Sequence, residues 1–377
     1  MKQLPITKNM TIDDILFGDA DIDDYYTPNT SNTRTTLVEN IPAKIISRFD
    51  FAKLIEKLED FNNRHLNLFE ADRHSLYYTF YIPKSSGGLR KIDAPVPSLM
   101  EALRELKSIF EVDFCALYHT AAFAYIKNRC AADSIKRHQN NESKWFLNLD
   151  FHNFFGSTTE DFVMSSFSNI FPFSQIVLRT AGRNALKKSL SLCFLDGGLP
   201  QGTPISPLIT NVMMIPIDHS LFKSLRDFDK RKFVYTRYAD DITISCKIDF
   251  NKELEIGLVK DTMQKFGAPF ELNEAKTRYG SSSGKNWNLG VMLNKDNEIT
   301  VGYRKKKAFK AMVNNFILDT INGKLWEVHD VQVLYGLFSY YSMIEKPTIE
   351  HIVNAFNIKY SVDFEAMAKR QMNTQEG

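Results

Sequence analysis

Short apolar runs and longer stretches of helical periodicity divide this chain into segments. Mainly apolar runs rich in β-branched and aromatic residues, as in strands, span 75–82, 144–151, 233–235 and 242–244. The first run leads through the glycine pair 87–88 into another apolar stretch, which predicts a β-hairpin. Apolar residues recur at helical spacing from about 51 to 64, and residues 98–140 are also predicted to be mainly helical.

Helical periodicity returns after residue 301. One apolar stripe comprises Phe309, Val313, Phe316 and Ile317, and another comprises Val331, Leu334, Leu337 and Phe338. Helices and strands thus occupy separate parts of the sequence, which is typical of an α+β fold with an antiparallel sheet. At 377 residues and 44% hydrophobic, the chain is long enough for two or three subdomains around a sizeable core.

Three aspartates stand at the ends of predicted strands. The segment Tyr238-Ala239-Asp240-Asp241 interrupts an apolar run, which predicts a hairpin whose turn carries two adjacent carboxylates. Asp150 ends another strand ninety positions upstream of Asp240. Carboxylate oxygens are ligands for hard divalent cations, so the three acids are candidate metal ligands. A pair of solvated turn residues is the simpler alternative for Asp240 and Asp241.

Five motifs in order make the chain resemble a reverse transcriptase from about residue 80 to 310. They are the Asp150 strand, Leu199-Pro200-Gln201-Gly202-Thr203-Pro204-Ile205-Ser206-Pro207, the Tyr238–Asp241 hairpin, Asn273-Glu274-Ala275-Lys276-Thr277 and Leu289-Gly290. The resemblance implies a right-hand polymerase with fingers, an antiparallel-sheet palm and a helical thumb. We expect an N-terminal extension at 1–48, fingers at 49–140, a palm at 141–300 with a helical fingers insertion at about 160–198, and a thumb at 301–377.

The resemblance also assigns the catalytic chemistry. Asp150, Asp240 and Asp241, with the carbonyl of Phe151, are expected to hold two Mg²⁺ ions about 4 Å apart, which Mn²⁺ can replace. In this interpretation Asp150 and Asp240 bridge the ions, and Asp241 is auxiliary.

Other residues are expected to bind the nucleotide. Lys84 and Arg90 belong to the hairpin whose cations in the family close over the triphosphate, although an exposed basic hairpin without a ligand is an alternative. Phe155 corresponds to the bulky residue that excludes a ribose 2′-hydroxyl, unless it is an ordinary core aromatic. Gln201 and Gly202 are expected near the incoming base, and Lys276 near the departing pyrophosphate.

Several residues are candidates for contact with primer or template. Tyr238, Leu289 and Gly290 match primer-binding positions, and Arg304, Lys305 and Lys306 form a basic cluster after the last motif. The net charge of +2 does not by itself identify a nucleic-acid binder, and a solvated helix face is the alternative for this cluster. A further basic set is suggested to follow the template backbone: Lys127, Arg129, Lys136, Arg137 and His138.

The expected partners are an RNA template, dNTPs and a DNA product, with an effector protein or a second copy of the chain also possible. Single cysteines, no apolar signal core and no membrane-spanning stretch predict a cytoplasmic protein.

We favour a bacterial defence-associated reverse transcriptase that copies a structured non-coding RNA. A retron enzyme is the second choice, because Asn288-Leu289-Gly290 replaces the usual Val-Thr-Gly. An untemplated or protein-primed nucleotidyl transferase and a catalytically silent RNA-binding module stay open.

Overall fold

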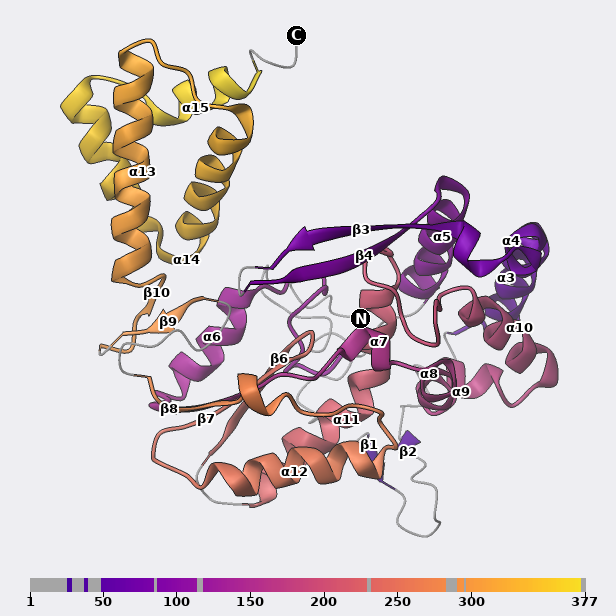
Figure 1. The fold of residues 1–377 in the computed structure, drawn as a ribbon. Helices are drawn as coiled ribbons and strands as arrows, with labels where there is room; N and C mark the ends of the chain where they lie inside the picture. Colours follow the sequence, from indigo (N-terminus) through magenta and orange to yellow (C-terminus); the bar gives the residue numbers. More distant parts are fainter. Residues whose placement is uncertain are drawn as a thin grey trace, which may run out of the picture. The chain divides into compact units, whose positions relative to one another are not determined.

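The computed structural model describes residues 26–28, 37–39, 49–84, 87–113, 118–228, 232–282, 290–294 and 296–373. Leu289 and most of the expected N-terminal extension lie outside these ranges. The chain divides into two compact units, each formed from separate stretches of sequence (Figure 1). The first unit comprises Met1–Asn128, Leu149–Ile242 and Asn251–Thr277, and the second comprises Arg129–Asn148, Thr243–Phe250 and Arg278–Gly377.

Most of the first unit is helical, with one long hairpin. Strands β3 (Tyr77–Pro83) and β4 (Leu89–Pro95) pair antiparallel over their full length, as the glycine pair between two apolar runs predicts (Figure 1). Short strands β1 (Tyr26–Pro28) and β2 (Leu37–Glu39) also pair antiparallel. The helices are α3 (Phe51–Arg64), α4 (Leu66–Glu70), η2 (Arg73–Leu76), α5 (Pro97–Asp113), α7 (Phe154–Ser157), α8 (Glu160–Phe167), α9 (Phe173–Ile176), α10 (Thr180–Ser191), α11 (Ser206–Phe228), α12 (Lys252–Lys265) and η3 (Glu274–Lys276).

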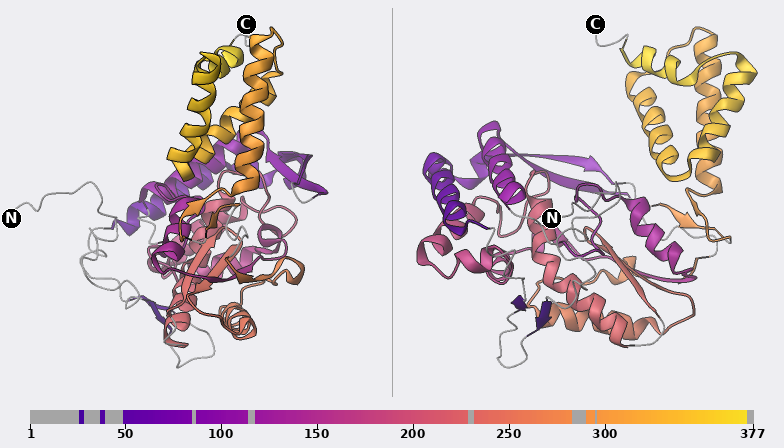
Figure 2. Two further views of the ribbon diagram at one scale, coloured as in Figure 1. Left: turned by 90° about the vertical axis from the view of Figure 1, so that its left-hand side faces the viewer. Right: turned by 180° about the vertical axis from the view of Figure 1, so that it is seen from behind.

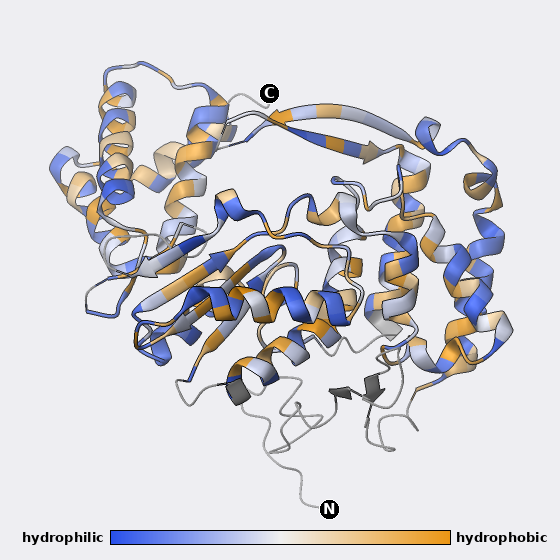
Figure 3. Cartoon of the chain, turned by 60° about the horizontal axis from the view of Figure 1, so that its bottom comes forward, coloured by the Kyte–Doolittle hydropathy of each residue, from blue (hydrophilic) through white to orange (hydrophobic). Residues whose placement is uncertain are grey.

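Helix α3 confirms the predicted 51–64 helix. The side chain of Asp50 accepts a hydrogen bond from the Lys53 backbone N–H at 2.9 Å and caps the first turn. The predicted apolar residues are buried on one face, which packs against α10. Asn62 lies in the same interface and donates to the Ala185 carbonyl at 2.9 Å, so its burial leaves the amide N–H₂ paired. Hydrophobic and hydrophilic residues both occur along each helix, as expected for helices with one buried face (Figure 3).

The predicted acid-bearing strands form one sheet. Among the described residues its order is β6 (Val234–Tyr238), β7 (Asp241–Cys246), β5 (Trp145–Leu149) and β8 (Arg278–Ser281), and β5 pairs antiparallel with β8. The chain passes between the two units within β5 and β7. The mixed α and β composition with antiparallel pairing confirms the α+β prediction.

The prediction that 98–140 is mainly helical is confirmed, with one stretch that is not helical. Helices α5 and α6 (Ala131–Asn140) account for its ends, but the described residues 118–130 form turns. The reason is tertiary pairing, since the Arg237 N–H of β6 donates to the Ala121 carbonyl at 2.7 Å and the Phe123 N–H donates back to the Arg237 carbonyl at 2.9 Å. A backbone paired with a strand cannot at the same time make helical hydrogen bonds.

Three helices form most of the second unit and confirm the helical periodicity after 301. These helices, α13 (Tyr303–Ile321), α14 (Val328–Tyr360) and α15 (Phe364–Asn373), lie side by side (Figures 1 and 2). Their shared core contains the predicted stripe residues, with Val313 and Phe316 fully buried. Helix α14 bends at Glu345, just before Pro347. The unit also contains α6 and the short antiparallel pair β9 (Met292–Leu293) and β10 (Ile299–Thr300). No helix in the described ranges is long and apolar enough to cross a membrane.

His138 does not lie where a template contact requires. It is 1% exposed on the inner face of α6, and its Nδ1 lies 2.6 Å from the Ser245 hydroxyl. The helical stripe that buries Ile135 also buries this position, three residues later. Burial lowers the pKa of His138 to about 3, with a smaller contribution from Arg137.

His138 should make the protein sensitive to acid. Its pKa in the folded state lies below the ordinary value of about 6.5, so the unfolded chain binds the proton first and stability falls as pH drops below that value. Between pH 7.5 and pH 5, we expect the free energy of unfolding measured in urea to fall by about 2 kcal/mol more in the wild type than in His138→Gln. His351→Gln, at an exposed position of α14, is the matched control. An equal fall in wild type and His138→Gln would contradict the prediction.

Candidate active site

The Tyr238–Asp241 segment forms the turn between β6 and β7. Tyr238 ends β6 and Asp241 begins β7, so Ala239 and Asp240 make a two-residue connection. Ala239 has φ +58°, the left-handed conformation that such a tight hairpin turn requires and that alanine rarely adopts. This turn places Asp240 and Asp241 at one end of the sheet.

Asp150 follows β5 and lies against the segment 271–276. The Asn273 N–H donates to the Asp150 carbonyl at 2.8 Å, and Phe151 forms a β-bridge with Leu272. This pairing brings Lys276 to the Asp150 side chain, where its Nζ lies 2.9 and 3.1 Å from the two carboxylate oxygens. Asp150 and Lys276 are 126 positions apart in sequence, so the ion pair depends on the fold.

Asp240 and Asp241 share the electrostatic environment of this pair. Burial raises the pKa of Asp240, and the negative charge of Asp150 raises it further. The pKa of Lys276 is raised chiefly by its hydrogen bond to Asp150, and also by the charges of Asp240 and Asp241. Lys276 thus pairs with Asp150 and interacts electrostatically with Asp240 and Asp241, and all four residues belong to the first unit.

The donor set suits a hard cation such as Mg²⁺. The charge of Asp150 makes ionisation of Asp240 more costly, and positive charge near both carboxylates offsets this cost; Lys276 supplies one such charge. Across the described residues, His, Cys, Asp and Glu side chains do not form a group of three that could hold a metal ion by themselves. Mg²⁺ is commonly bound through one or two carboxylates plus substrate phosphates, so the arrangement fits a site that substrate completes.

The loop that carries Gln201 and Gly202 is attached to the hairpin β3–β4. The Asp93 N–H of β4 donates to the Gln201 carbonyl at 2.8 Å. Gly202 has φ +125°, and a Cβ there would lie 2.9 Å from both the Asp93 carbonyl oxygen and Ile92 Cγ2. Glycine is required here for both its conformation and its lack of a side chain.

Gly202→Ala should therefore displace the loop. We expect a loss of about 1–3 kcal/mol in the free energy of unfolding, from backbone strain and the clash with β4. The rate of nucleotide addition should fall at least about tenfold, because the loop would no longer hold Gln201 in place. The control is Gly197→Ala, which also has a positive φ of +79° but open space around its Cβ. Equal stability and activity in the two variants would rule out the contact with β4 as the cause.

The two adjacent phenylalanines face different surroundings. Phe154 is 2% exposed and packs against Phe151 and Phe270, with ring centroids 5.6 and 4.7 Å away. Phe155 is only partly buried, and its carbonyl accepts a hydrogen bond from the Leu199 N–H at 2.9 Å. Phe154 is thus the core residue of the pair, and Phe155 adjoins the loop of Gln201. The ring of Phe151 also faces the core, which leaves its carbonyl as the only group that suits a metal.

The cations of the hairpin differ in their partners. Arg90 is exposed and contributes to the electrostatic environment of Asp240. Lys84 is exposed at the end of β3, next to the glycine turn. Lys91, which was not among the predicted site residues, lies 3.1 Å from Asp93 Oδ1. Of these three, Arg90 is the one whose charge acts on Asp240.

In the basic cluster Arg304, Lys305 and Lys306, two side chains form hydrogen bonds within the protein. Lys305 Nζ donates to the Gly290 carbonyl at 2.7 Å, and Lys306 Nζ donates to Glu345 at 2.6 Å and to the Thr300 hydroxyl at 3.1 Å. Arg304 is exposed. Two of the three predicted nucleic-acid contacts therefore already hold protein groups together, and Arg304 has the more accessible side chain.

Sequence reasoning missed two groups near these acids. Tyr125 is 61% exposed with φ +59°, and the charges of Asp240 and Arg90 act on its hydroxyl. Arg237 and Asp218 form an ion pair at 2.8 Å with both side chains almost fully buried. For Arg237 and Asp218, the signal in the sequence is a charged residue inside an apolar strand or helix. Such a residue requires a partner when it is buried.

Comparison with known proteins places this arrangement in a family. A family model described as reverse transcriptase (RNA-dependent DNA polymerase) matches residues 82–310, well over half of the chain. The chain belongs to the reverse transcriptase family. As an RNA-directed DNA polymerase it contains the predicted motifs within the matched range, and the family generally uses divalent metals.

Several curated relatives of this reverse transcriptase are retron enzymes. The retron Ec83 reverse transcriptase of Escherichia coli is 29% identical over 289 residues, which are 73% of this chain and 85% of that protein. The retron Ec73 reverse transcriptase of the same organism is 30% identical over 207 residues, 54% of this chain and 64% of that protein. A solved structure of apo telomerase from Candida tropicalis is 16% identical with a TM-score of 0.44, and the match covers 73% of this chain and 63% of that one.

Proposed function

We propose that this reverse transcriptase copies a structured non-coding RNA into DNA in the bacterial cytoplasm, as part of defence against phage. The observation that supports the catalytic part is the ion pair between Asp150 and Lys276, whose ammonium group also interacts electrostatically with Asp240 and Asp241 in the same compact unit. The retron relatives favour a product in which the single-stranded DNA remains linked to RNA. The similarity to retron enzymes supports this interpretation, although Asn288-Leu289-Gly290 differs from the usual Val-Thr-Gly.

The proposed division of labour follows the geometry. Asp150 and Asp240 would hold two Mg²⁺ ions, with Asp241 and the Phe151 carbonyl as additional ligands. Such ions, when bound, make the primer 3′-hydroxyl a better nucleophile and stabilise the charge on the transferred phosphate. Residues 49–140 and 160–198 would form the fingers, 141–300 the palm and 301–377 the thumb.

Lys276 would change partners during a catalytic cycle. Its side chain is 59% exposed, whereas that of Asp150 is 13% exposed, so the lysine covers a carboxylate that has little other access to solvent. In the free protein its ammonium group pairs with Asp150 and offsets one of the three negative charges. When a nucleotide binds, the flexible lysine is able to turn to the anionic phosphates and to neutralise the departing pyrophosphate.

Phe155 is the proposed barrier to ribonucleotides. Phe155 is partly buried and its backbone adjoins the Gln201 loop, where a bulky side chain would leave no room for a 2′-hydroxyl. Phe155→Ala should raise the kcat/KM for rNTPs relative to dNTPs by about tenfold or more. Phe155→Tyr preserves the bulk and is the matched control. Unchanged discrimination in Phe155→Ala would place the barrier elsewhere.

The test of the proposed function is to identify template and product together. The full chain is purified from bacterial cells, and the RNA and DNA that copurify are sequenced, with Asp240→Asn as the inactive control. We expect one structured RNA in both samples and its complementary DNA only with the wild type. The purified wild type should also extend a primer on a supplied RNA template with dNTPs. A product that ignores the template sequence would contradict the proposal.

Protein priming is a second candidate, favoured by one observation. Tyr125 has a 61% exposed side chain, and the pKa of its hydroxyl is raised by desolvation and also by the negative charge of Asp240. A tyrosine hydroxyl at a polymerase centre is able to accept the first nucleotide. This alternative predicts DNA that is covalently attached to the protein by a linkage that survives phenol treatment. The attached DNA should be absent in Tyr125→Phe. Free DNA ends in the wild type would exclude it.

A further inference from the structure

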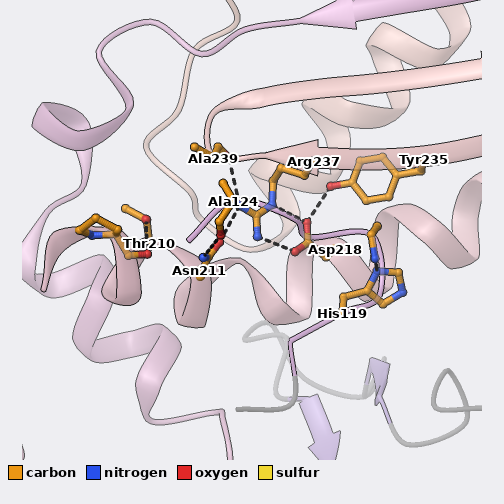
Figure 4. Close-up of polar contacts among 10 residues, drawn as sticks. His119, Ala124, Thr210, Asn211, Asp218, Tyr235, Arg237 and Ala239 are labelled. Atoms are coloured by element: carbon orange, nitrogen blue, oxygen red, sulfur yellow. Dashed lines mark hydrogen bonds and ion pairs between the residues drawn. The ribbon is translucent and has the colours of Figure 1, made fainter. Parts of the chain in front are cut away.

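A buried arginine connects the core of the first unit to the turn that carries the acids. Arg237 is 1% exposed in β6, three residues before Asp240. Its Nε and Nη2 atoms each lie 2.8 Å from a different oxygen of the Asp218 carboxylate, which comes from α11. The Tyr235 hydroxyl donates to the same carboxylate at 2.7 Å. One edge of the guanidinium is thus fully engaged with a buried acid (Figure 4).

The remaining nitrogen of Arg237 points the other way. Nη1 donates to the Ala239 carbonyl at 3.0 Å and to the Asn211 side-chain oxygen at 3.1 Å. Asn211, also on α11, in turn donates to the Ala124 carbonyl at 2.7 Å. Figure 4 shows Arg237 between Asp218 on one side and Asn211 and Ala239 on the other. The planar group therefore spans from a rigid helix to the backbone of the turn.

The contacted residue is the strained one. Ala239 has φ +58°, and its carbonyl belongs to the peptide bond that leads into Asp240. A non-glycine residue keeps this conformation only when its surroundings impose it. A hydrogen bond from a charged donor to that carbonyl fixes the orientation of the peptide, and with it the direction in which Asp240 leaves the turn.

We propose that Arg237 is a positioning residue, which holds the Ala239 carbonyl and thereby sets how the turn presents Asp240 and Asp241 to a divalent cation. This inference rests on the proposed function of the two acids. The ion pair with Asp218 supplies the buried counter-charge and aligns the guanidinium. The bond to Ala239 then transmits the position of α11 to the turn.

The decisive variant is the pair Arg237→Gln and Asp218→Asn in one chain. It removes both buried charges together, so neither is left unpaired, and Gln is too short to reach both Asp218 and the Ala239 carbonyl. We expect a cooperative unfolding transition but a rate of nucleotide addition lower by about 10- to 100-fold. The Mg²⁺ concentration for half-maximal rate should rise severalfold, and Mn²⁺ binding measured by electron paramagnetic resonance should weaken by a similar factor.

Tyr235→Phe is the matched control. It removes one hydrogen bond from the Asp218 carboxylate without touching Ala239, so it should lower the Tm and leave the Mg²⁺ and Mn²⁺ midpoints as in the wild type. A loss of stability alone would not move these midpoints. If the double variant does not fold, Arg237→Lys replaces it, because lysine keeps the ion pair but cannot also reach Ala239. Wild-type midpoints in the folded variant would overturn the inference.

The metal readout separates this inference from the proposed function. A wild type that binds Mn²⁺ but copies no template would refute the proposed function, and weakened Mn²⁺ binding in the variant would still support the role of Arg237. A wild type that copies RNA while the variant matches it in rate and midpoints would refute the role of Arg237 alone.

Discussion

Asp240→Asn should abolish DNA synthesis without harming the fold. Asp240 is one of the acids that would hold the metal ions, and an amide in its place would offer them a single neutral oxygen. We expect the rate of dNTP addition on an RNA template to fall by about a thousandfold or more, which corresponds to roughly 4 kcal/mol of transition-state stabilisation. Single-turnover extension of a labelled primer measures this directly.

The same variant should be at least as stable as the wild type when metal is absent. Burial and the charge of Asp150 raise the pKa of Asp240, so its ionised form disfavours folding at neutral pH, and the neutral amide removes that cost. Urea unfolding in EDTA should therefore show an equal or higher midpoint. Adding Mg²⁺ should stabilise the wild type more than the variant.

Asp261→Asn is the control for this substitution. Asp261 is exposed on α12 of the same unit, so losing its charge should change neither the rate nor the unfolding midpoint measurably. Full polymerase activity in Asp240→Asn would remove the assignment of the acids. A large loss of stability in EDTA would show instead that Asp240 supports the fold.

The local features of this site were predictable because each is written in a short stretch of sequence. A strand that ends in an acid, a two-residue turn and a helical stripe such as that of Phe309 and Val313 depend on residues a few positions apart. The structure shows these elements at the predicted positions. The catalytic roles of Asp150, Asp240 and Asp241 came from the family resemblance and stay predictions.

Long-range pairing was not predictable from pattern alone. Arg237 interrupts an apolar strand and Asp218 an apolar helix, which indicates two buried charges but does not say that they meet. The turns at 118–130 arise because that backbone pairs with β6, a choice that local propensity does not encode. His138 likewise resembled a surface cation in sequence, and only the packing of α6 shows that it is buried.

Removing Arg237 alone should cost more stability than any substitution proposed above. Both members of the ion pair are almost completely buried, with Arg237 at 0% and Asp218 at 1% side-chain exposure. Arg237→Ala leaves the Asp218 carboxylate in the core with only the Tyr235 hydroxyl as a remaining donor from this network. The expected loss is about 3–5 kcal/mol in the free energy of unfolding, measured in urea at pH 7.5.

The double substitution shows whether the loss of stability comes from an unpaired buried charge or from lost packing. Arg237→Gln with Asp218→Asn leaves no charge behind, so it should lose much less stability than Arg237→Ala, although it removes both ends of the pair. Arg104→Ala, at an exposed position of α5, should stay within about 0.5 kcal/mol of the wild type. Because a buried pair is poorly screened, the loss in Arg237→Ala should be the same in 0.05 and 0.5 M salt. A loss that shrinks with salt would mean that water reaches this pair, and the turn that bears Asp240 would then lack a rigid support.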